Sequence, residues 1–202
     1  LGSASVICTD KTGTLTRNEM TIVRVVTASA DVEITGAGYL TDGDVRRDGE
    51  VVHDATLLEE VHLVVGAGSL ANDASLQDVD ERRVDVLGDP TEAAFLVAER
   101  KLGLTEQREG RYRRVGEVPF RSERKLMTTV DHDHTRPAGV PALMVTTKGA
   151  PDVLLDRCSR ERVGGEVVAL TPQRRAEIHA DVERLADAAL RTLAVAYRPF
   201  GD

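Results

Sequence analysis

Apolar residues recur at helical spacing in three segments of the chain. The first is marked by apolar side chains three and four positions apart, at Leu57, Leu58, Val61, Val64 and Val65. Thr56 and Glu59 have the spacing of a capping box at its start. The segment is therefore predicted to be an amphipathic helix with one face on a core.

Two further helices are predicted from signals at their ends. Asp89 is suited to cap the second helix, Pro90 to occupy its first position and Gly103 to follow its last turn. The third helix is predicted from Thr171 to about Leu190. Its apolar face would consist of Ile178, Val182, Leu185 and Ala189.

Shorter apolar runs, alternating or clustered, predict strands between these helices. The predicted strands cover residues 4–9, 22–26, 32–34, 115–120, 126–130, 142–147 and 192–197. The segment 36–49 is rich in Gly and Asp, as hairpins and loops are. Because strands and helices do not alternate regularly, we expect an α+β fold with a largely antiparallel sheet beyond residue 20.

Charge and composition narrow the functional classes. The formal charge of −8 and the six Tyr and Phe, without Trp, argue against nucleic acid as a partner. Cys8 and Cys158 lie far apart and lack metal-ligand spacing, which argues against a disulfide scaffold or a zinc site. No apolar stretch approaches the roughly 20 residues that cross a bilayer, and none resembles a signal peptide. A reducing, cytosolic setting fits these features.

One short stretch, Asp10 to Thr16 (DKTGTLT), has residue types that suit phosphoryl transfer to a carboxylate. Asp10 ends a predicted strand and is the natural nucleophile, since an aspartate can attack a γ-phosphate to give an acyl phosphate. Lys11 and Mg²⁺ would offset the anionic charge, and Gly13 would let backbone N–H groups approach the phosphate. A strand followed by a turn would explain any four of these residues. Seven in succession favour the chemical interpretation.

The same stretch resembles the phosphorylation signature of the P-type (E1–E2) cation-transporting ATPases, membrane pumps that form an aspartyl phosphate. Four more segments resemble motifs of that family in the same order. They are 88–92 (GDPTE), 119–127 (PFRSERKLM), 148–151 (KGAP) and 190–194 (LRTLA). Segment 119–127 is similar to the type II pumps of the calcium and magnesium branch, and the low aromatic content favours a bacterial source.

The resemblance implies two domains and a set of site residues. Residues 1–20 would belong to a phosphorylation domain, and 21–200 would form a nucleotide-binding domain, a twisted, mainly antiparallel sheet flanked by helices. Asp10 and Lys11 would be catalytic, and Asp10 and Thr12 would help to hold Mg²⁺ in the intact pump. The residues implied to bind ATP are Glu92, Phe120 (stacked on adenine), Ser122, Lys125, Lys148, Gly149 and Arg191.

Several of these residues also have a structural interpretation. Glu92 could close a capping box with Asp89, and Phe120 could be an ordinary core residue at a strand end. Lys148 begins what could be a plain strand-to-helix turn, with a Pro at the first helical position. Arg191 could complement the C-terminal end of the third helix.

The sequence lacks later family segments of the TGD and GDGVND kind, the transmembrane helices and the actuator. We therefore expect a soluble, monomeric piece of a pump, from the cytoplasmic face of a cell membrane, that binds ATP weakly without turning it over. Its partners would be ATP and the pump's phosphorylation, actuator and transmembrane domains. Residues 1–20 would be poorly packed or displaced. The alternatives are a soluble phosphatase or phosphotransferase of the haloacid-dehalogenase type and a non-catalytic interaction domain.

Overall fold

The computed structural model describes residues 19–200, so the strand and the loop predicted at 4–16 lie outside the described residues. The helices are α1 (Ala55–Leu70), α2 (Pro90–Lys101), α3 (Thr105–Arg111), α4 (Pro151–Leu155) and α5 (Pro172–Asp187). The strands are β1 (Arg24–Val26), β2 (Asp31–Ile34), β3 (Val45–Arg47), β4 (Glu50–Val51), β5 (Ser75–Asp78), β6 (Val84–Leu87), β7 (Tyr112–Arg121), β8 (Leu126–Asp133), β9 (Leu143–Gly149), β10 (Arg160–Val163), β11 (Glu166–Ala169) and β12 (Ala194–Pro199).

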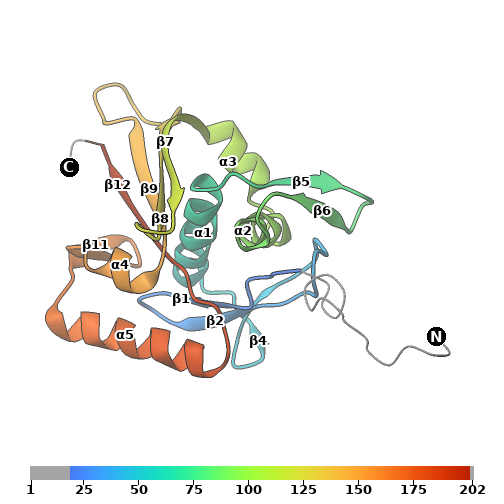
Figure 1. Ribbon diagram of the computed structural model, residues 1–202, viewed down its shortest axis with the longest axis horizontal. Coiled ribbons are helices and arrows are strands. Elements are labelled where there is room, and N and C mark those ends of the chain that lie inside the picture. The colour runs from blue at the N-terminus through green and yellow to red at the C-terminus, as the bar shows by residue number, and fades with distance from the viewer. Residues whose placement is uncertain (1–18, 201–202) are drawn as a thin grey trace, which may run out of the picture.

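The largest strands form a four-stranded sheet in the order β12-β9-β8-β7. Every pairing in it is antiparallel, as predicted. In the register of the central strands, Lys148 of β9 lies opposite Met127 of β8 and Val195 of β12. Figure 1 shows α1 between this sheet and α2, so the inner face of the sheet is covered by helices. The α+β fold with a mainly antiparallel sheet is confirmed.

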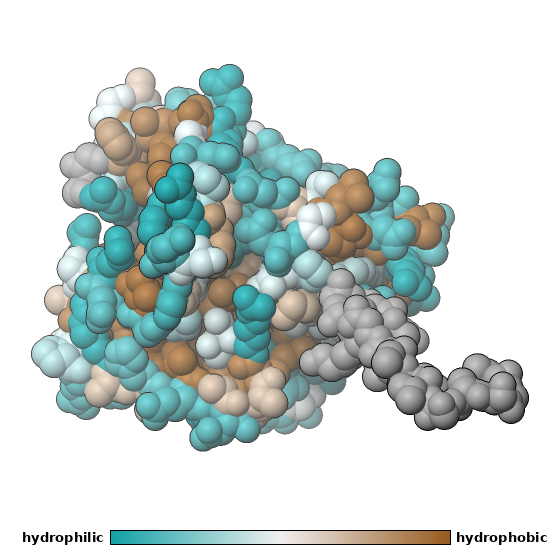
Figure 2. Space-filling view, viewed as in Figure 1, coloured by the Kyte–Doolittle hydropathy of each residue, from teal (hydrophilic) through white to brown (hydrophobic). Residues whose placement is uncertain are grey.

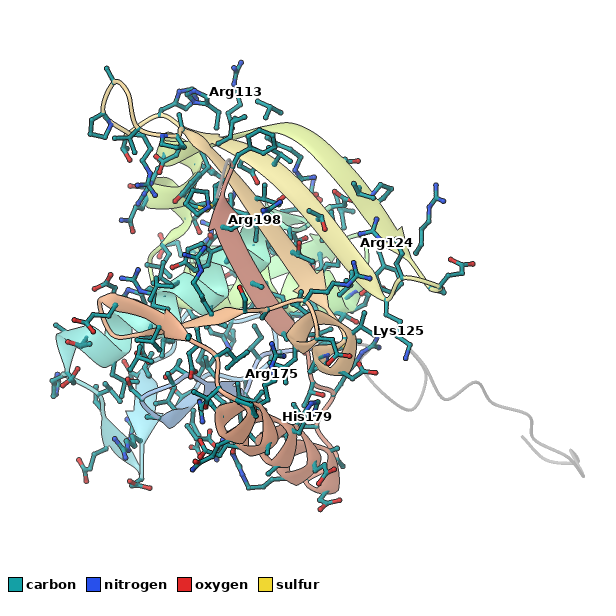
Figure 3. The ribbon with its side chains drawn as sticks, turned by 90° about the vertical axis from the view of Figure 1, so that its left-hand side faces the viewer. Arg113, Arg124, Lys125, Arg175, His179 and Arg198 are labelled. Carbon is teal, nitrogen blue, oxygen red and sulfur yellow. The ribbon has the colours of Figure 1, made fainter. Side chains whose placement is uncertain are left out.

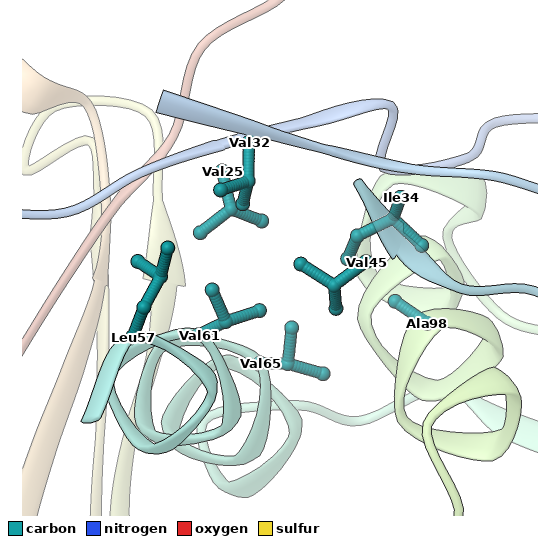
Figure 4. Packing of buried hydrophobic residues seen from close by; sticks show 8 residues of the cluster. All are labelled: Val25, Val32, Ile34, Val45, Leu57, Val61, Val65 and Ala98. Atoms are coloured by element: carbon teal, nitrogen blue, oxygen red, sulfur yellow. The ribbon is translucent and has the colours of Figure 1, made fainter. Parts of the chain in front are cut away.

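A second sheet, in the order β1-β2-β3-β4, packs against α1 and α2. Its apolar side chains meet those of α1 and α2 in one cluster, drawn in Figure 4. The cluster comprises Val25, Val32, Ile34, Val45, Leu57, Val61, Val65 and Ala98. Each fully buried Val, Leu or Ile adds about 1.5–3 kcal/mol of hydrophobic stabilisation. This cluster therefore fixes the position of α1, on which the four-stranded sheet also packs.

The helix starts follow local chemistry, and one of them differs from the prediction. Asp89 caps α2 through its side-chain oxygen, as predicted, and the side-chain oxygen of Thr171 caps α5. The predicted capping box of Thr56 and Glu59 is wrong, because α1 begins at Ala55 and the Asp54 carboxylate accepts a hydrogen bond from Leu57 N at 2.8 Å. A carboxylate two residues earlier satisfies the free N–H groups of the first turn.

Three short elements were not predicted, namely the β5–β6 hairpin, α3 and the β10–β11 hairpin. The strands of both hairpins are mostly exposed, so they lack the apolar alternation that marks a half-buried strand. Figure 2 shows hydrophobic side chains on the projecting β5–β6 hairpin, where Val79 and Leu87 are exposed.

The predicted third helix is present as α5, but it ends at Asp187 instead of about Leu190. Its predicted apolar face is only partly buried, since Ile178, Val182 and Leu185 have intermediate exposure and Ala189 is exposed. Among residues 19–200, no helix combines the length and the apolar character needed to cross a membrane.

Close contact between α1 and α2 depends on a glycine. A Cβ atom on Gly68 would collide with the ring of Phe95, which is 5% exposed. Gly66, one half-turn earlier on the same helix, has open space around it. Gly68 is therefore needed for packing and Gly66 is not, although both lie near the C-terminal end of α1, in a helix where glycine is intrinsically unfavourable.

We predict that Gly68→Ala lowers the free energy of unfolding by about 1–3 kcal/mol, because the added methyl group must displace the Phe95 ring. Gly66→Ala is the matched control and should raise it by up to about 1 kcal/mol through helix propensity alone. Urea unfolding followed by circular dichroism measures both changes. Equal effects of the two substitutions would contradict the packing of α1 on α2.

Candidate functional site

A buried ion pair joins the end of β9 to the first turn of α2. The Nζ atom of Lys148 lies 3.1 Å from Oε1 of Glu92. The Lys148 side chain is 5% exposed and that of Glu92 is 18% exposed. The two residues are 56 positions apart in the sequence, and the fold brings them together. Two residues of the predicted ATP site are therefore in direct contact.

The remaining polar atoms of Glu92 bind the loop that follows α1. Its second carboxylate oxygen accepts a hydrogen bond from Asp73 N at 3.1 Å, and its backbone carbonyl accepts one from Asn72 Nδ2 at 2.7 Å. The alternative interpretation, that the Glu92 side chain closes a capping box with Asp89, is wrong, because both side-chain oxygens are engaged elsewhere. Asp89 still caps the helix through the Thr91 and Glu92 amides.

The surroundings of Lys148 are unfavourable for a charge. Burial lowers the pKa of the Lys148 ammonium group, and the neighbouring carboxylate of Glu92 partly offsets this. The carboxylates of Asp73 and Asp89 act in the same direction as Glu92. The ammonium also lies 5.2 Å from the centroid of the Phe95 ring, within range of a cation–π interaction.

The end of β7 and the turn that joins it to β8 carry three more of the predicted residues. Phe120 is 56% exposed, Ser122 is exposed, and Lys125 is exposed with its Nζ atom 3.7 Å from Asp152 Oδ2. A surface ion pair of this kind contributes about 0–1 kcal/mol, so Lys125 is not strongly held. Figure 3 shows Lys125 and Arg124 at this end of the sheet. The alternative interpretation of Phe120 as a core residue is wrong.

Gly149 has a structural role that the sequence did not reveal. A Cβ atom there would collide with the carbonyl oxygen of Lys125 and crowd Leu126 on β8. The same carbonyl accepts a hydrogen bond from Ala150 N at 3.1 Å. Lys125 itself has a φ of +55°, a left-handed conformation that costs free energy for any residue other than Gly. The β7–β8 turn is therefore clamped against the start of α4, directly beside Lys148.

Arg191 is exposed and acts on the start of α2. Burial raises the pKa of the Asp89 carboxyl, but hydrogen bonds from Thr91 and Glu92, together with the charge of Arg191, outweigh it and lower that pKa. Arg191 is therefore near the helix turn that carries Glu92.

The short helix predicted to begin at Pro151 is present as α4.

The predicted catalytic and metal-binding residues Asp10, Lys11 and Thr12 lie outside the described residues. Within residues 19–200, no cluster of three or more His, Cys, Asp or Glu side chains could hold a metal ion. Sequence reasoning also missed Asn72, Asp73 and Phe95 as neighbours of the ion pair. An Asn-Asp pair directly after a helix is an ordinary turn signal, and only the fold reveals what the turn holds.

A polar cavity of about 380 Å³ lies between α1, α2, α3, β5 and β7, and Asn72 and Arg114 are among the residues that line it. Glu99 and Asp131 line it, and burial raises the pKa of both carboxyls. None of the described residues predicted to bind ATP lines this cavity. Of the residues predicted to bind ATP, Lys148 and Glu92 are in direct contact, whereas Phe120 near the end of β7 and Lys125 in the β7–β8 turn are exposed.

We predict that Glu92→Gln lowers the pKa of the Lys148 ammonium group further, because the buried cation loses its nearest anion. A pH titration of the Lys148 side chain by NMR measures the shift. Asp152→Asn is the matched control, since Asp152 pairs with the exposed Lys125 and should leave the Lys148 titration unchanged. An equal pKa of Lys148 in the Glu92→Gln and Asp152→Asn variants would contradict the ion pair.

Comparison with known proteins gives a family for this arrangement. Residues 60–202 match the family model "P-type ATPase, cytoplasmic domain N". The calcium-transporting ATPase of Bacillus subtilis is 40% identical over 202 residues, which cover 98% of this chain and 22% of that protein. Mouse calcium-transporting ATPase type 2C member 1 is 38% identical over 98% of this chain and 21% of its own length. A probable cation-transporting ATPase F of Mycobacterium tuberculosis is 39% identical over 96% and 21%.

This chain spans about a fifth of the length of these curated relatives. The family match covers well over half of the chain, including Glu92, the whole four-stranded sheet and Lys148. The chain belongs to the P-type ATPase family and contains its cytoplasmic domain N.

Proposed function

We propose that residues 21–200 bind ATP at the corner formed by Glu92, Phe120, Lys125 and Lys148. The observation that carries the proposal is the buried Lys148–Glu92 pair at the end of the central strand β9. Burying two charges costs more free energy than burying apolar side chains of similar size. A buried ion pair with a perturbed pKa is therefore more typical of a functional site than of a hydrophobic core.

Each of these side chains could make one of the contacts that bind a nucleotide. Phe120 is 56% exposed and offers a ring face on which adenine stacks. Glu92 and Lys148 supply an acceptor and a donor for the polar edge of the base or for the ribose. Lys125, Ser122 and Arg191 lie on the exposed rim, where positive charge and a hydroxyl group suit phosphate oxygens.

We further propose that the chain serves a larger pump, with Asp10 as the residue that takes the γ-phosphate and Lys11 beside it. Asp10 and Thr12 would hold Mg²⁺, which would neutralise charge as the phosphoryl group is transferred. The relatives named as calcium-transporting ATPases make a calcium pump the favoured parent. The domain would then face the cytoplasm, and the chain alone would bind ATP without turning it over.

We predict that ATP binds this chain with a Kd on the order of millimolar, or about −4 kcal/mol. Phe120→Ala should weaken binding by roughly 5- to 150-fold, since stacking of one base on an aromatic ring contributes about 1–3 kcal/mol. An NMR titration with ATP measures both, with saturable shifts expected at the amides of residues 120–125 and 148–150.

Phe200 provides a matched control, because its side chain is also 56% exposed but lies at the far end of β12. Phe200→Ala should leave the Kd unchanged. Saturable binding that survives Phe120→Ala, or shifts that cluster at the separate polar cavity, would overturn the proposed site. The absence of any saturable shift would overturn ATP binding by this chain.

A further inference from the structure

Arg114 ties strand β7 to the loop that follows α1. Its Nη2 atom donates to the carbonyl oxygens of Leu70 at 2.7 Å and Asn72 at 2.6 Å. Its Nη1 atom donates to Asp73 Oδ1 at 2.7 Å and to Glu117 Oε2 at 3.0 Å. One guanidinium group thus binds three acceptors, at Leu70, Asn72 and Asp73, which is the geometry that a planar fork of donors provides and a lysine does not.

The same loop holds Glu92 at two points. Asp73 N donates to one carboxylate oxygen, and Asn72 Nδ2 donates to the backbone carbonyl of Glu92. Asn72 is itself fixed, because its Oδ1 atom accepts a hydrogen bond from Ala74 N at 2.8 Å. The loop therefore has a defined shape, and its contact with Glu92 leaves a single carboxylate oxygen, Oε1, directed at Lys148.

Among residues 19–200, the hydrogen bonds of Arg114 go to the loop and to Glu117, and none goes to Glu92 or Lys148. The hydrogen-bonded connection from Arg114 to the ion pair therefore runs through the 72–73 loop, and the Asp73 amide is the part of that loop that contacts the Glu92 carboxylate. A Glu side chain has three rotatable bonds, and fixing one oxygen on a backbone N–H removes most of that freedom before a ligand arrives.

We propose that Arg114 is a positioning residue for nucleotide recognition, which acts by holding the 72–73 loop so that the Asp73 amide orients the Glu92 carboxylate toward Lys148. This inference rests on the proposed ATP site. Strand β7 would then contribute to the site in two ways, because it carries both Phe120 and Arg114.

The first test uses the nucleotide-free chain. In Arg114→Met, the Asp73 amide should lose its hydrogen bond to Glu92, which moves its proton resonance upfield. The pKa of Lys148 is compared in Arg114→Lys, which keeps a positive charge beside Asp73. It should fall, because Glu92 no longer stays beside Lys148 while the carboxylates of Asp73 and Asp89 remain the other facing charges. Arg113→Met, at the adjacent exposed position of β7, is the control and should change neither.

The second test measures ATP affinity in a double-mutant cycle. Arg114→Met should raise the Kd about tenfold, the size of one well-oriented hydrogen bond to a charged group. If Arg114 acts through Glu92, adding Arg114→Met to Glu92→Gln should cause no further loss. Circular dichroism and the urea midpoint show whether each variant is folded, and Arg114→Lys replaces Arg114→Met if the latter is not.

The outcomes separate this inference from the proposed function. An unchanged Asp73 amide and Lys148 titration in the Arg114 variants would overturn the positioning role, whether or not ATP binds. Additive losses in the cycle would overturn it as well, because Arg114 would then act on the nucleotide by another route. ATP binding to the wild-type chain with no effect of Arg114→Met would leave the ATP site standing and remove Arg114 from it.

Discussion

The structure of the site depends on one constraint, the need to keep the Lys148 ammonium group charged where little water reaches it. Its only direct salt-bridge partner in the described part of the chain is Glu92. The desolvation cost of such a pair commonly exceeds its Coulomb attraction, so the pair adds little to stability. Removal of one partner leaves the other charge buried without a counter-charge, which strongly destabilises the protein. The two side chains must therefore stay within contact distance of each other.

That constraint explains the arrangement of the surrounding elements. Glu92 must sit in the first turn of α2, and α2 is set in place by its contact with α1 at Gly68 and Phe95. Lys148 must end a central strand, and Gly149 lets the neighbouring β7–β8 turn approach it closely. The core beneath the second sheet holds α1, so the hydrophobic cluster and the ion pair belong to one connected framework.

The sequence was sufficient to predict the elements with a strong local signal, and insufficient for contacts between distant segments. Asp89 and Pro90 begin α2 as predicted because capping is decided within a few residues. The role of Glu92 was ambiguous, since its position in the first turn fits a capping box equally well, and only the approach of β9 decides where the carboxylate points. The proposed site residues came from the resemblance of short segments to a known family. The loop at 72–73 was not predicted to contact them, because nothing in its turn-like sequence indicates what it contacts.

The central claim is that adenine lies at the corner of Phe120, Glu92 and Lys148. Intermolecular nuclear Overhauser effects between the adenine H2 and H8 protons of ATP and the protein test it most directly. The account predicts effects to the Phe120 ring and to the side chain of Lys148. Effects to Leu76 and Leu96, which line the separate polar cavity, with none to Phe120, would contradict it.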